Sequence, residues 1–351
     1  MGVDLVGDAI MTTLASPSLA TAGPRTPPVR ALKRCPLCDG QQSELLYRLN
    51  DPSGKLEGVF ELRRCLGCEL VHVDPRPSDE ALAALYDEDF YFSTGWSYDR
   101  IASWVIEFIQ TGRRRRVERY VRGGSLLDIG SGDGRFVHHM ARHGWDATGL
   151  DFSPAALEYA GRIKSGGRFV QGSLDDEEFR PCSLELITLW QVLEHIGEPR
   201  PLLRRCHEML KPGGVLVAAV PNIEGLSSRL TGERWWGLDV PRHLVHYTPN
   251  TLQASLERAG FCVIQISHRS LQYDPYALFH SLLDWVFTRR HFLSDLAKRR
   301  PEAGMGRPEY LYNVAALVAL APLLAPLCVA TTMVGSFAGR GGFIEVHARR
   351  E

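Results

Sequence analysis

The 351-residue chain lacks an excess of charge of either sign: 40 Lys and Arg residues face 41 Asp and Glu residues, for a formal net charge of −1. That balance argues against nucleic acid as a partner, because proteins that bind phosphate backbones are usually strongly basic. Residues 1–30 also lack the basic stretch and following apolar block of a secretory signal. We therefore expect a disordered leader over 1–30 and a cytoplasmic protein with no nucleic-acid partner.

Cysteine is too sparse and too unevenly spaced for a disulfide framework, with eight residues in the whole chain. Four of them form two Cys-x-x-Cys pairs, Cys35 with Cys38 and Cys65 with Cys68. Two such pairs present four thiolates tetrahedrally to zinc, and the interval between them suits a small β-hairpin. The spacing predicts a zinc ribbon over residues 31–75 with a structural Zn²⁺; a redox pair or unligated thiols are the alternatives.

Three glycines spaced two apart, Gly130, Gly132 and Gly134, follow an apolar run that carries Asp128 and precede a helical pattern. Glycines there let the backbone turn sharply and let a ligand touch the main chain near the start of the helix. Arg135 occupies the position where a dinucleotide fingerprint has its third glycine, which disfavours an NAD-linked oxidoreductase. A second short strand ends at Asp151, which suits hydrogen bonds to the ribose hydroxyls of an adenosine cofactor.

Together these residues resemble the class I S-adenosylmethionine (SAM) methyltransferases. The resemblance implies that the glycine loop, Asp128, Asp151 and the adjacent Phe152 hold the methionine moiety and ribose of SAM. It places the adenine ring near Ser173 and Leu174, although many relatives carry an acid where this chain has Ser173. Trp190 borders the methionine arm or the methyl group, or else packs at the sheet edge.

From Ser125 onward, strands alternate regularly with helices, which predicts an α/β fold with a doubly wound, Rossmann-like sheet. The resemblance implies seven strands with the last one antiparallel. The predicted strands are Leu126–Ile129, Ala147–Asp151, Arg168–Gln171, Glu185–Trp190, Val215–Pro221, Cys262–Ser267 and Phe343–Ala348. The predicted domains are the ribbon, a helical connector or aromatic lid over 76–123, the SAM-binding domain over 124–270 plus 342–351, and an apolar helical insertion over 271–341. In the connector, we expect the arginine run 113–116 to form a solvated helix face.

Three histidines are candidate general bases: His195 after the fourth strand, and His243 and His246 after the fifth. Ligands bind at the carboxyl ends of parallel strands, and a base helps when the acceptor is a hydroxyl. A structural role in the loop is the alternative for His243 and His246. The segment ending at His195 is similar to the E-V-L-E-H sequence of ubiquinone-type O-methyltransferases, whose acids and histidine accompany a divalent metal. Because Gln191 replaces the first acid, we predict no metal there.

No charged residue occurs from Val314 to Val334, a length that could span a bilayer. Pro322 and Pro326 should break such a helix, so we expect a broken helical hairpin or a surface helix, with both ends of the segment on one side of any membrane. Apolar residues from Tyr276 onward and cations from Arg289 onward predict peripheral contact of 276–340 with the inner face of the membrane. A homodimer interface or a cap over the acceptor pocket are the alternatives.

The function predicted from these features is SAM-dependent transfer of a methyl group to a small-molecule, lipid-linked or isoprenoid-linked acceptor. Because the sulfonium supplies a good leaving group, the enzyme mainly aligns donor and acceptor for in-line displacement, here most simply at oxygen. C-methylation of a nucleotide-linked sugar is the alternative reaction. A non-catalytic zinc-ribbon docking module on a methyltransferase-like fold is the alternative of another class.

Overall fold

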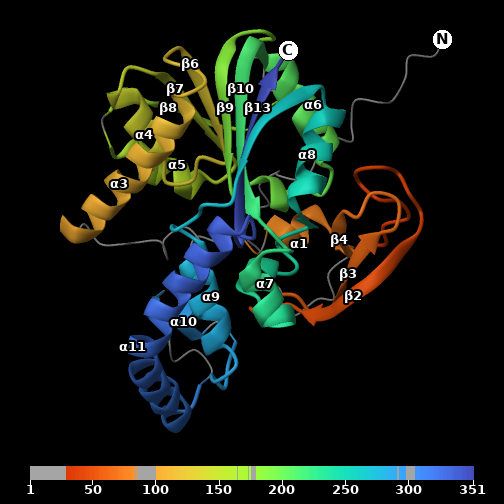
Figure 1. Cartoon of the computed structure of the whole chain (residues 1–351), viewed down its shortest axis with the longest axis vertical. Helices are drawn as coiled ribbons and strands as arrows, with labels where there is room; N and C mark the ends of the chain where they lie inside the picture. Colours follow the sequence, from red (N-terminus) through yellow and green to blue (C-terminus); the bar gives the residue numbers. More distant parts are fainter. Residues whose placement is uncertain are drawn as a thin grey trace.

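The computed structural model describes residues 29–83, 85, 100–163, 165–172, 174, 179–290, 292–297 and 305–351. Nearly all of the predicted leader, the aromatic segment 86–98 and Ser173 lie outside the described residues. Seven strands form the central sheet, in the order β12-β13-β10-β9-β6-β7-β8 (Figure 1). Their bounds are β6 Ser125–Ile129, β7 Asp146–Asp151, β8 Arg168–Gln171, β9 Leu184–Trp190, β10 Leu210–Pro221, β12 Phe261–Ser267 and β13 Phe343–Arg350.

Strands β6 to β10 run parallel to one another, and β13 runs antiparallel to both β10 and β12. This confirms the predicted Rossmann-like α/β fold with an antiparallel last strand. The predicted strand bounds agree to within two residues except for β10, which begins five residues early at Leu210, and continues through a register irregularity before Val215.

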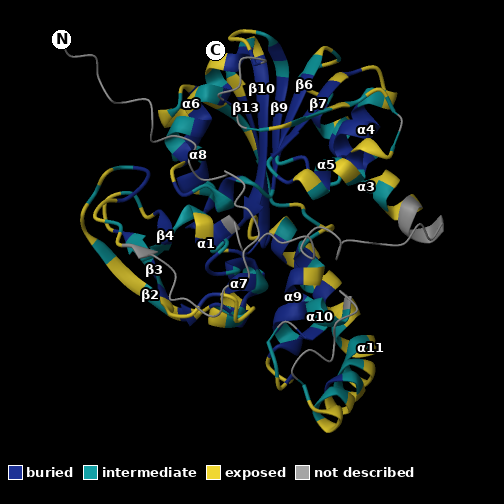
Figure 2. Cartoon of the chain, turned by 180° about the vertical axis from the view of Figure 1, so that it is seen from behind, coloured by how far each residue is buried: buried dark blue, intermediate teal, exposed yellow. Residues whose placement is uncertain are grey.

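Alternate residues of the buried strands point to opposite faces of the sheet, and a different set of helices covers each face. Leu126 and Val217 pack with α3 (Arg100–Val117) and α4 (Arg135–Arg142) in one cluster. Leu127 and Leu216 belong to a second cluster, with α6 (Pro199–Met209) and α8 (Pro249–Arg258). Figure 2 shows the central strands almost wholly buried between these layers. Ser153 caps the N-terminus of another helix, α5 (Pro154–Gly161), as expected.

A second sheet contains the four cysteines at its turns. Its strands are β2 (Ser43–Asn50), β3 (Val59–Cys65) and β4 (Val71–Asp74), in the order β11-β4-β3-β2. The fourth member, β11 (Val245–His246), comes from the region after β10, and was not predicted. A short pairing of β1 (Val29–Arg30) with β5 (Arg76–Pro77) and the helix α1 (Asp79–Ala83) follow at its border.

The insertion before the last strand contains α9 (Asp274–Leu283), α10 (Phe292–Ala297) and α11 (Arg307–Phe337). The predicted break is wrong: α11 continues through Pro322 and Pro326, both of which lie on its exposed side. Because these prolines are four residues apart, the carbonyls that they leave without a helical partner lie on that same side, where water reaches them.

The ends of this insertion, rather than the ends of the apolar segment, lie together at the sheet. Asp274 at the start of α9 accepts hydrogen bonds from the Gly342 backbone N–H (2.7 Å) and the Ser227 hydroxyl (2.8 Å). Helices α9 and α10 therefore lead the chain away from the sheet, and α11 returns it to β13. The sequence predicted that both ends of the apolar segment stay on one side of any membrane. In the structure it is the two ends of the whole insertion, residues 271–341, that lie on one side.

One buried ion pair fastens helix α3 to the last strand. Arg116 donates two hydrogen bonds to Glu345 (2.7 and 2.8 Å), and His347 contacts the same carboxylate at 2.8 Å. Burial alone would raise the pKa of Glu345, but the hydrogen bonds from His347 and Arg116 outweigh it and lower this pKa to about 2. The pair therefore stabilises the fold above the ordinary carboxyl pKa, and this contribution is lost as the pH falls from about 4.5 towards 2.

We expect Arg116→Ala to lower the free energy of unfolding by about 1–2 kcal/mol at neutral pH. The loss is smaller than for a fully buried pair because the Arg116 side chain is 36% exposed and screened by solvent. Arg115→Ala, which removes an exposed neighbour, is the control and should change stability by less than about 0.5 kcal/mol. Urea unfolding of both variants at pH values near 7 and 3 checks this, because the difference between them should shrink in acid.

Candidate functional site

The glycine loop after β6 has a backbone that other residues would not adopt without strain. Gly130, Gly132 and Gly134 all have positive φ angles, of 66°, 53° and 73°. A Cβ at Gly130 would lie 2.5 Å from the Val192 side chain, and one at Gly134 would lie 2.6 Å from the Phe169 ring. The loop therefore needs glycine for its conformation and for close packing against the side chains of Val192 and Phe169.

Two buried acids flank this loop, as the sequence predicted. The Asp128 carboxylate accepts a hydrogen bond from the Thr188 hydroxyl at 2.6 Å, and burial raises its pKa to about 7. Asp151 accepts hydrogen bonds from the Gly132 N–H (2.8 Å) and the Ser153 N–H (2.9 Å), and burial raises its pKa as well. Asp151 thus holds the loop from the tip of the neighbouring strand.

The remaining predicted cofactor residues border the same edge of the sheet. Leu174 is buried in the larger core cluster, and the Phe152 carbonyl accepts a 3.5 Å hydrogen bond from Gln171. Trp190 ends β9 and meets the Phe136 ring edge-on, with ring centroids 5.4 Å apart. Phe152, Leu174 and Trp190 therefore lie at or after the ends of three strands of the parallel part of the sheet, β7, β8 and β9.

The sequence predicted a solvent-exposed position for Arg113, and this prediction is wrong. The run 113–116 is not a solvated face: Arg113 is only 6% exposed, Arg116 pairs with Glu345, and Arg114 pairs with Glu118. The Arg113 guanidinium lies 4.3 Å from the centroid of the Trp190 ring and donates a 2.6 Å hydrogen bond to the Tyr273 hydroxyl. A buried cation therefore lies at the carboxyl end of β9. The spacing of polar residues along helix α3 could not have indicated this.

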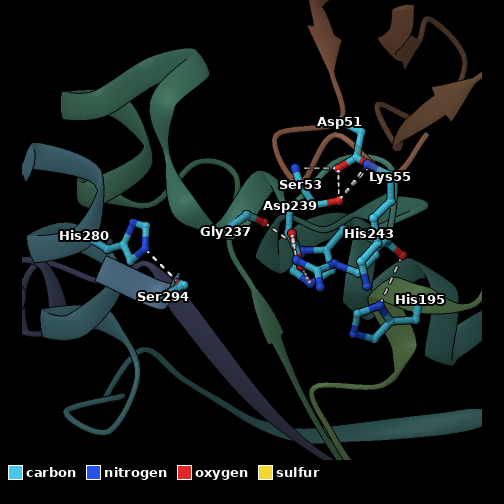
Figure 3. Close-up of polar contacts among 10 residues, drawn as sticks. Asp51, Ser53, Lys55, His195, Gly237, Asp239, His243, His280 and Ser294 are labelled. Carbon is cyan, nitrogen blue, oxygen red and sulfur yellow. Dashed lines mark hydrogen bonds and ion pairs between the residues drawn. The ribbon is translucent and has the colours of Figure 1, made fainter. Parts of the chain in front are cut away.

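The three candidate histidines come together from two distant segments, and Figure 3 shows two of them, His195 and His243. His195 ends the short 3₁₀ helix η2 (Leu193–His195), and its ring lies 4.7 Å from that of His243, which lies 6.2 Å from that of His246. Burial lowers the pKa of His195 and of His246 to about 3, and lowers that of His243 as well. All three imidazoles are therefore neutral at physiological pH.

Backbone carbonyls fix the orientation of two of these rings. His195 Nδ1 lies 3.1 Å from the Arg242 carbonyl, and His243 Nδ1 lies 2.9 Å from the Gly237 carbonyl. Because a carbonyl only accepts, each Nδ1 must carry the proton and each Nε2 a lone pair. On the other side of the His243 ring, Nε2 lies 3.8 Å from the Asp239 carboxylate.

The four predicted ligand cysteines converge at one end of the second sheet. Their sulfur atoms all lie within 4.8 Å of one another, with Cys35 to Cys68 and Cys38 to Cys65 both at 3.5 Å. Backbone N–H groups of Leu37, Gly40 and Gly67 point at sulfur atoms, an arrangement that stabilises thiolates. The residues thus fit a four-thiolate zinc site, in which sulfurs lie about 3.8 Å apart.

The cysteine-bearing sheet contacts the central domain close to the histidines. The Leu244 carbonyl accepts from the Val73 N–H (3.0 Å), while the Leu244 N–H donates to the Glu194 carbonyl (2.8 Å). Beside the cysteines, Asp39 forms a two-bond ion pair with Arg200 on α6, at 2.8 Å each. The sequence predicted a ribbon preceding the SAM-binding domain and did not predict that it pairs with the segment carrying the candidate histidines.

A family profile described as "Methyltransferase domain" matches residues 98–266. The chain is 29% identical over 182 residues to "Ubiquinone biosynthesis O-methyltransferase" of Xanthomonas euvesicatoria, covering 49% of this chain and 73% of the relative. It is 30% identical over 166 residues to the protein of that name from Xanthomonas campestris (strain B100), covering 44% of this chain and 68% of the relative. The solved phosphoethanolamine N-methyltransferase 2 of Haemonchus contortus aligns with a TM-score of 0.48 at 17% identity, covering 80% of this chain and 62% of that one.

We predict that the cysteine cluster retains zinc tightly and that this ion supports the local fold. Cys38→Ser combined with Cys68→Ser should remove about one equivalent of zinc and lower the unfolding temperature, because the small sheet has little core of its own. The control combines Cys182→Ser with Cys262→Ser, which changes two exposed cysteines outside the cluster. Metal analysis and thermal unfolding provide the measurements, and equal zinc content in the two double variants would contradict the assignment.

Proposed function

Because this chain belongs to the class I SAM-dependent methyltransferases, we propose that it transfers the methyl group of SAM to a hydroxyl oxygen of a small acceptor carrying a lipid or isoprenoid chain. The observation that carries the assignment is the glycine loop, held between two buried acids at adjacent strand tips. The name of these relatives, ubiquinone biosynthesis O-methyltransferase, supports transfer to oxygen.

Each part of the loop region has a role in holding SAM, which supplies the activated methyl group as a sulfonium. Asp151 accepts hydrogen bonds from the ribose hydroxyls in addition to those from backbone N–H groups, since each carboxylate oxygen has two lone pairs. The glycine backbone lets the methionine moiety approach closely, and the Arg113 cation pairs with its carboxylate. Phe152 and Leu174 border the adenine, and Trp190 borders the methyl group.

His195 is the candidate general base. It follows β9 directly, so it lies at the carboxyl edge of the sheet where acceptors bind in open α/β folds. Its Nδ1 lies 3.1 Å from the Arg242 carbonyl, which fixes the orientation of the ring. His243 supports this arrangement from the ring next to it, and His246 lies further along the same row.

The choice of a lipid-linked acceptor rests on α11. Apart from its first turn, this helix contains no charged residue, and it is about 46 Å long. Only 6% of its most apolar 18-residue stretch is buried. Its length and composition suffice to cross a membrane, but its return to the sheet favours a helix that lies against one leaflet. Its exposed large apolar residues are Leu311, Tyr312, Val318, Leu323, Leu327, Val329, Met333, Val334 and Phe337.

Cations and an exposed tryptophan lie at the border of this apolar surface. The Arg269 guanidinium lies 5.7 Å from the Phe337 ring, and Arg234 lies 4.7 Å from the ring of Trp285, which is 60% exposed. Tryptophan and arginine prefer the boundary between head groups and acyl chains, and anionic head groups attract the cations. An acceptor with an apolar chain would therefore meet the site at the surface of the inner leaflet.

We predict that the purified protein binds SAM and its demethylated product, S-adenosylhomocysteine, through Asp151. Asp151→Ala should weaken both affinities at least about tenfold, because two ribose hydrogen bonds to a charged acceptor are lost. Asp146→Ala, at the other end of the same strand, is the control and should leave both affinities unchanged. Isothermal titration calorimetry with SAM and with NAD tests this, and binding of NAD alone would overturn the assignment.

We predict that the protein co-sediments with vesicles containing anionic phospholipid through α11. Leu323→Ser with Phe337→Ser should weaken vesicle binding about tenfold or more, because each substitution removes about 1.5 kcal/mol of apolar burial in the lipid. The control, Val59→Ser with Leu66→Ser, changes two equally apolar exposed residues of the cysteine-bearing sheet. Vesicle binding that survives in the α11 variant would refute the membrane proposal. A shift from dimer to monomer in that variant, with no vesicle binding in the wild type, would identify the surface as a dimer interface.

A further inference from the structure

Helix α3 carries two bulky aromatic rings on its exposed face. Trp104 is 77% exposed, and Phe108, one turn later, is 73% exposed. Among the described residues, these two and Phe337 of α11, at 75%, are the most exposed large apolar side chains. Single exposed apolar residues are common in proteins, but two aromatic rings side by side on one helix form a patch that calls for a partner.

Cations continue the same face towards the end of the helix. Residues 104, 108, 111 and 115 recur at intervals of four, three and four, so they lie in one row along α3. Arg115 is exposed in this row, and Arg119 is exposed in the turn that follows the helix. The opposite face of the helix is buried and carries Arg113. The exposed face of α3 therefore combines aromatic rings with cations.

The acids of α3 and its final turn are paired elsewhere, which leaves this face positive. Glu107 lies 3.2 Å from the guanidinium of Arg142, and Glu118 lies 2.6 Å from that of Arg114. No described carboxylate lies within ion-pair distance of Arg115 or Arg119. Anionic lipid head groups attract such cations, while exposed tryptophan prefers the boundary between head groups and acyl chains.

We propose that the exposed face of α3 binds an anionic membrane surface, with Trp104 and Phe108 entering the head-group boundary and Arg115 and Arg119 contacting the head groups. This contact is separate from that of α11 and uses none of its residues. It deepens the proposed function, on which it rests for the choice of a membrane as the partner, because a lipid-linked acceptor requires the enzyme to reach the bilayer.

The position of α3 beside the insertion favours a membrane over an acidic protein as the partner. Arg113 Nη2 donates hydrogen bonds to the Gln272 side chain (3.2 Å) and to the Tyr273 hydroxyl (2.6 Å), immediately before α9. Helix α3 is thereby fastened to the insertion that carries the apolar surface of α11. Figure 1 shows α3 and α11 on the same side of the central sheet.

Two separate contacts have a consequence that one contact lacks. A protein held by α11 alone can rotate about that helix, whereas contact through α3 as well fixes its orientation on the leaflet. The second contact forms within a molecule that is already bound, so it strengthens binding beyond the affinity of either surface. Because Arg113 joins the two elements, the part of the site next to Arg113 would face the head-group layer.

The experiment measures co-sedimentation of the full chain with vesicles of phosphatidylcholine and phosphatidylglycerol. Trp104→Ser combined with Phe108→Ser should weaken vesicle binding at least about tenfold, because two aromatic anchors are lost. Arg115→Gln combined with Arg119→Gln should weaken it about fivefold or more on these vesicles, and should have no effect on vesicles of phosphatidylcholine alone. The double variant of the cysteine-bearing sheet described above is again the control and should bind as the wild type does.

A second measurement uses a conservative variant, so that it does not depend on the stability of the serine variants. Vesicles that contain phospholipid brominated in its acyl chains quench the fluorescence of tryptophans that enter the bilayer. Quenching should be stronger in the wild type than in Trp104→Phe, which keeps an aromatic ring at this position. Because the changed side chains are exposed, the unfolding temperature of every variant should match that of the wild type.

The outcomes separate this inference from the proposed function. Vesicle binding that is unchanged in the α3 variants but lost in the α11 variant would overturn the inference and leave the α11 contact standing. Equal quenching in the wild type and Trp104→Phe would also overturn it. Absence of vesicle binding in the wild type would overturn both membrane contacts, while SAM affinity decides the methyltransferase assignment independently. A shift from dimer to monomer in the α3 serine variant, with vesicle binding unchanged, would identify this face as an interface between two copies of the chain.

Discussion

The structure depends on one topological constraint: strands β6, β7, β9 and β10 are parallel, so all of them end at the same edge of the sheet. The glycine loop, both acids, Trp190 and the histidine cluster therefore share that edge although they are spread over more than a hundred residues. Because β13 runs antiparallel between β10 and β12, the insertion also leaves from and returns to it. Figure 1 accordingly shows the cysteine-bearing sheet and α9–α11 at the same end of the central sheet.

Features set by neighbouring residues were predicted well from the sequence. The glycine loop needs positive φ angles, which glycine adopts without strain, and Asp151 follows at a spacing set by one strand–loop–helix unit. The start of α8 is equally local: Thr248 and Thr251 form a capping box, and Pro249 occupies the first turn. In each case a few adjacent residues determine the backbone conformation, so the local sequence is enough to predict it.

Features set by contacts between distant segments were not predicted. Nothing in the arginine run distinguishes Arg113 from Arg115, yet Arg113 is buried because Trp190 and Tyr273 come from elsewhere in the chain. The pairing of β4 with β11 joins two segments about 170 residues apart through only two residues each. The break predicted at the two prolines of α11 does not occur, because both prolines face outward and the helix packs against α9. These outcomes depend on tertiary packing, which overrides local preference.

The cysteine-bearing sheet packs against the segment that carries two of the candidate histidines. A two-residue strand pairing is weak by itself, since isolated short β pairs are marginal in water. Here one continuous apolar cluster joins Leu62, Leu70 and Val73 of that sheet to Leu244 and Tyr247 of the central domain. The segment carrying His243 and His246 is therefore held between the two units. Local unfolding of the cysteine-bearing sheet would therefore disturb the histidines more than the glycine loop. The parallel strands hold the glycine loop independently of that sheet. This arrangement argues against a separate docking function for the ribbon, because its buried face is already occupied by the segment that carries the histidines.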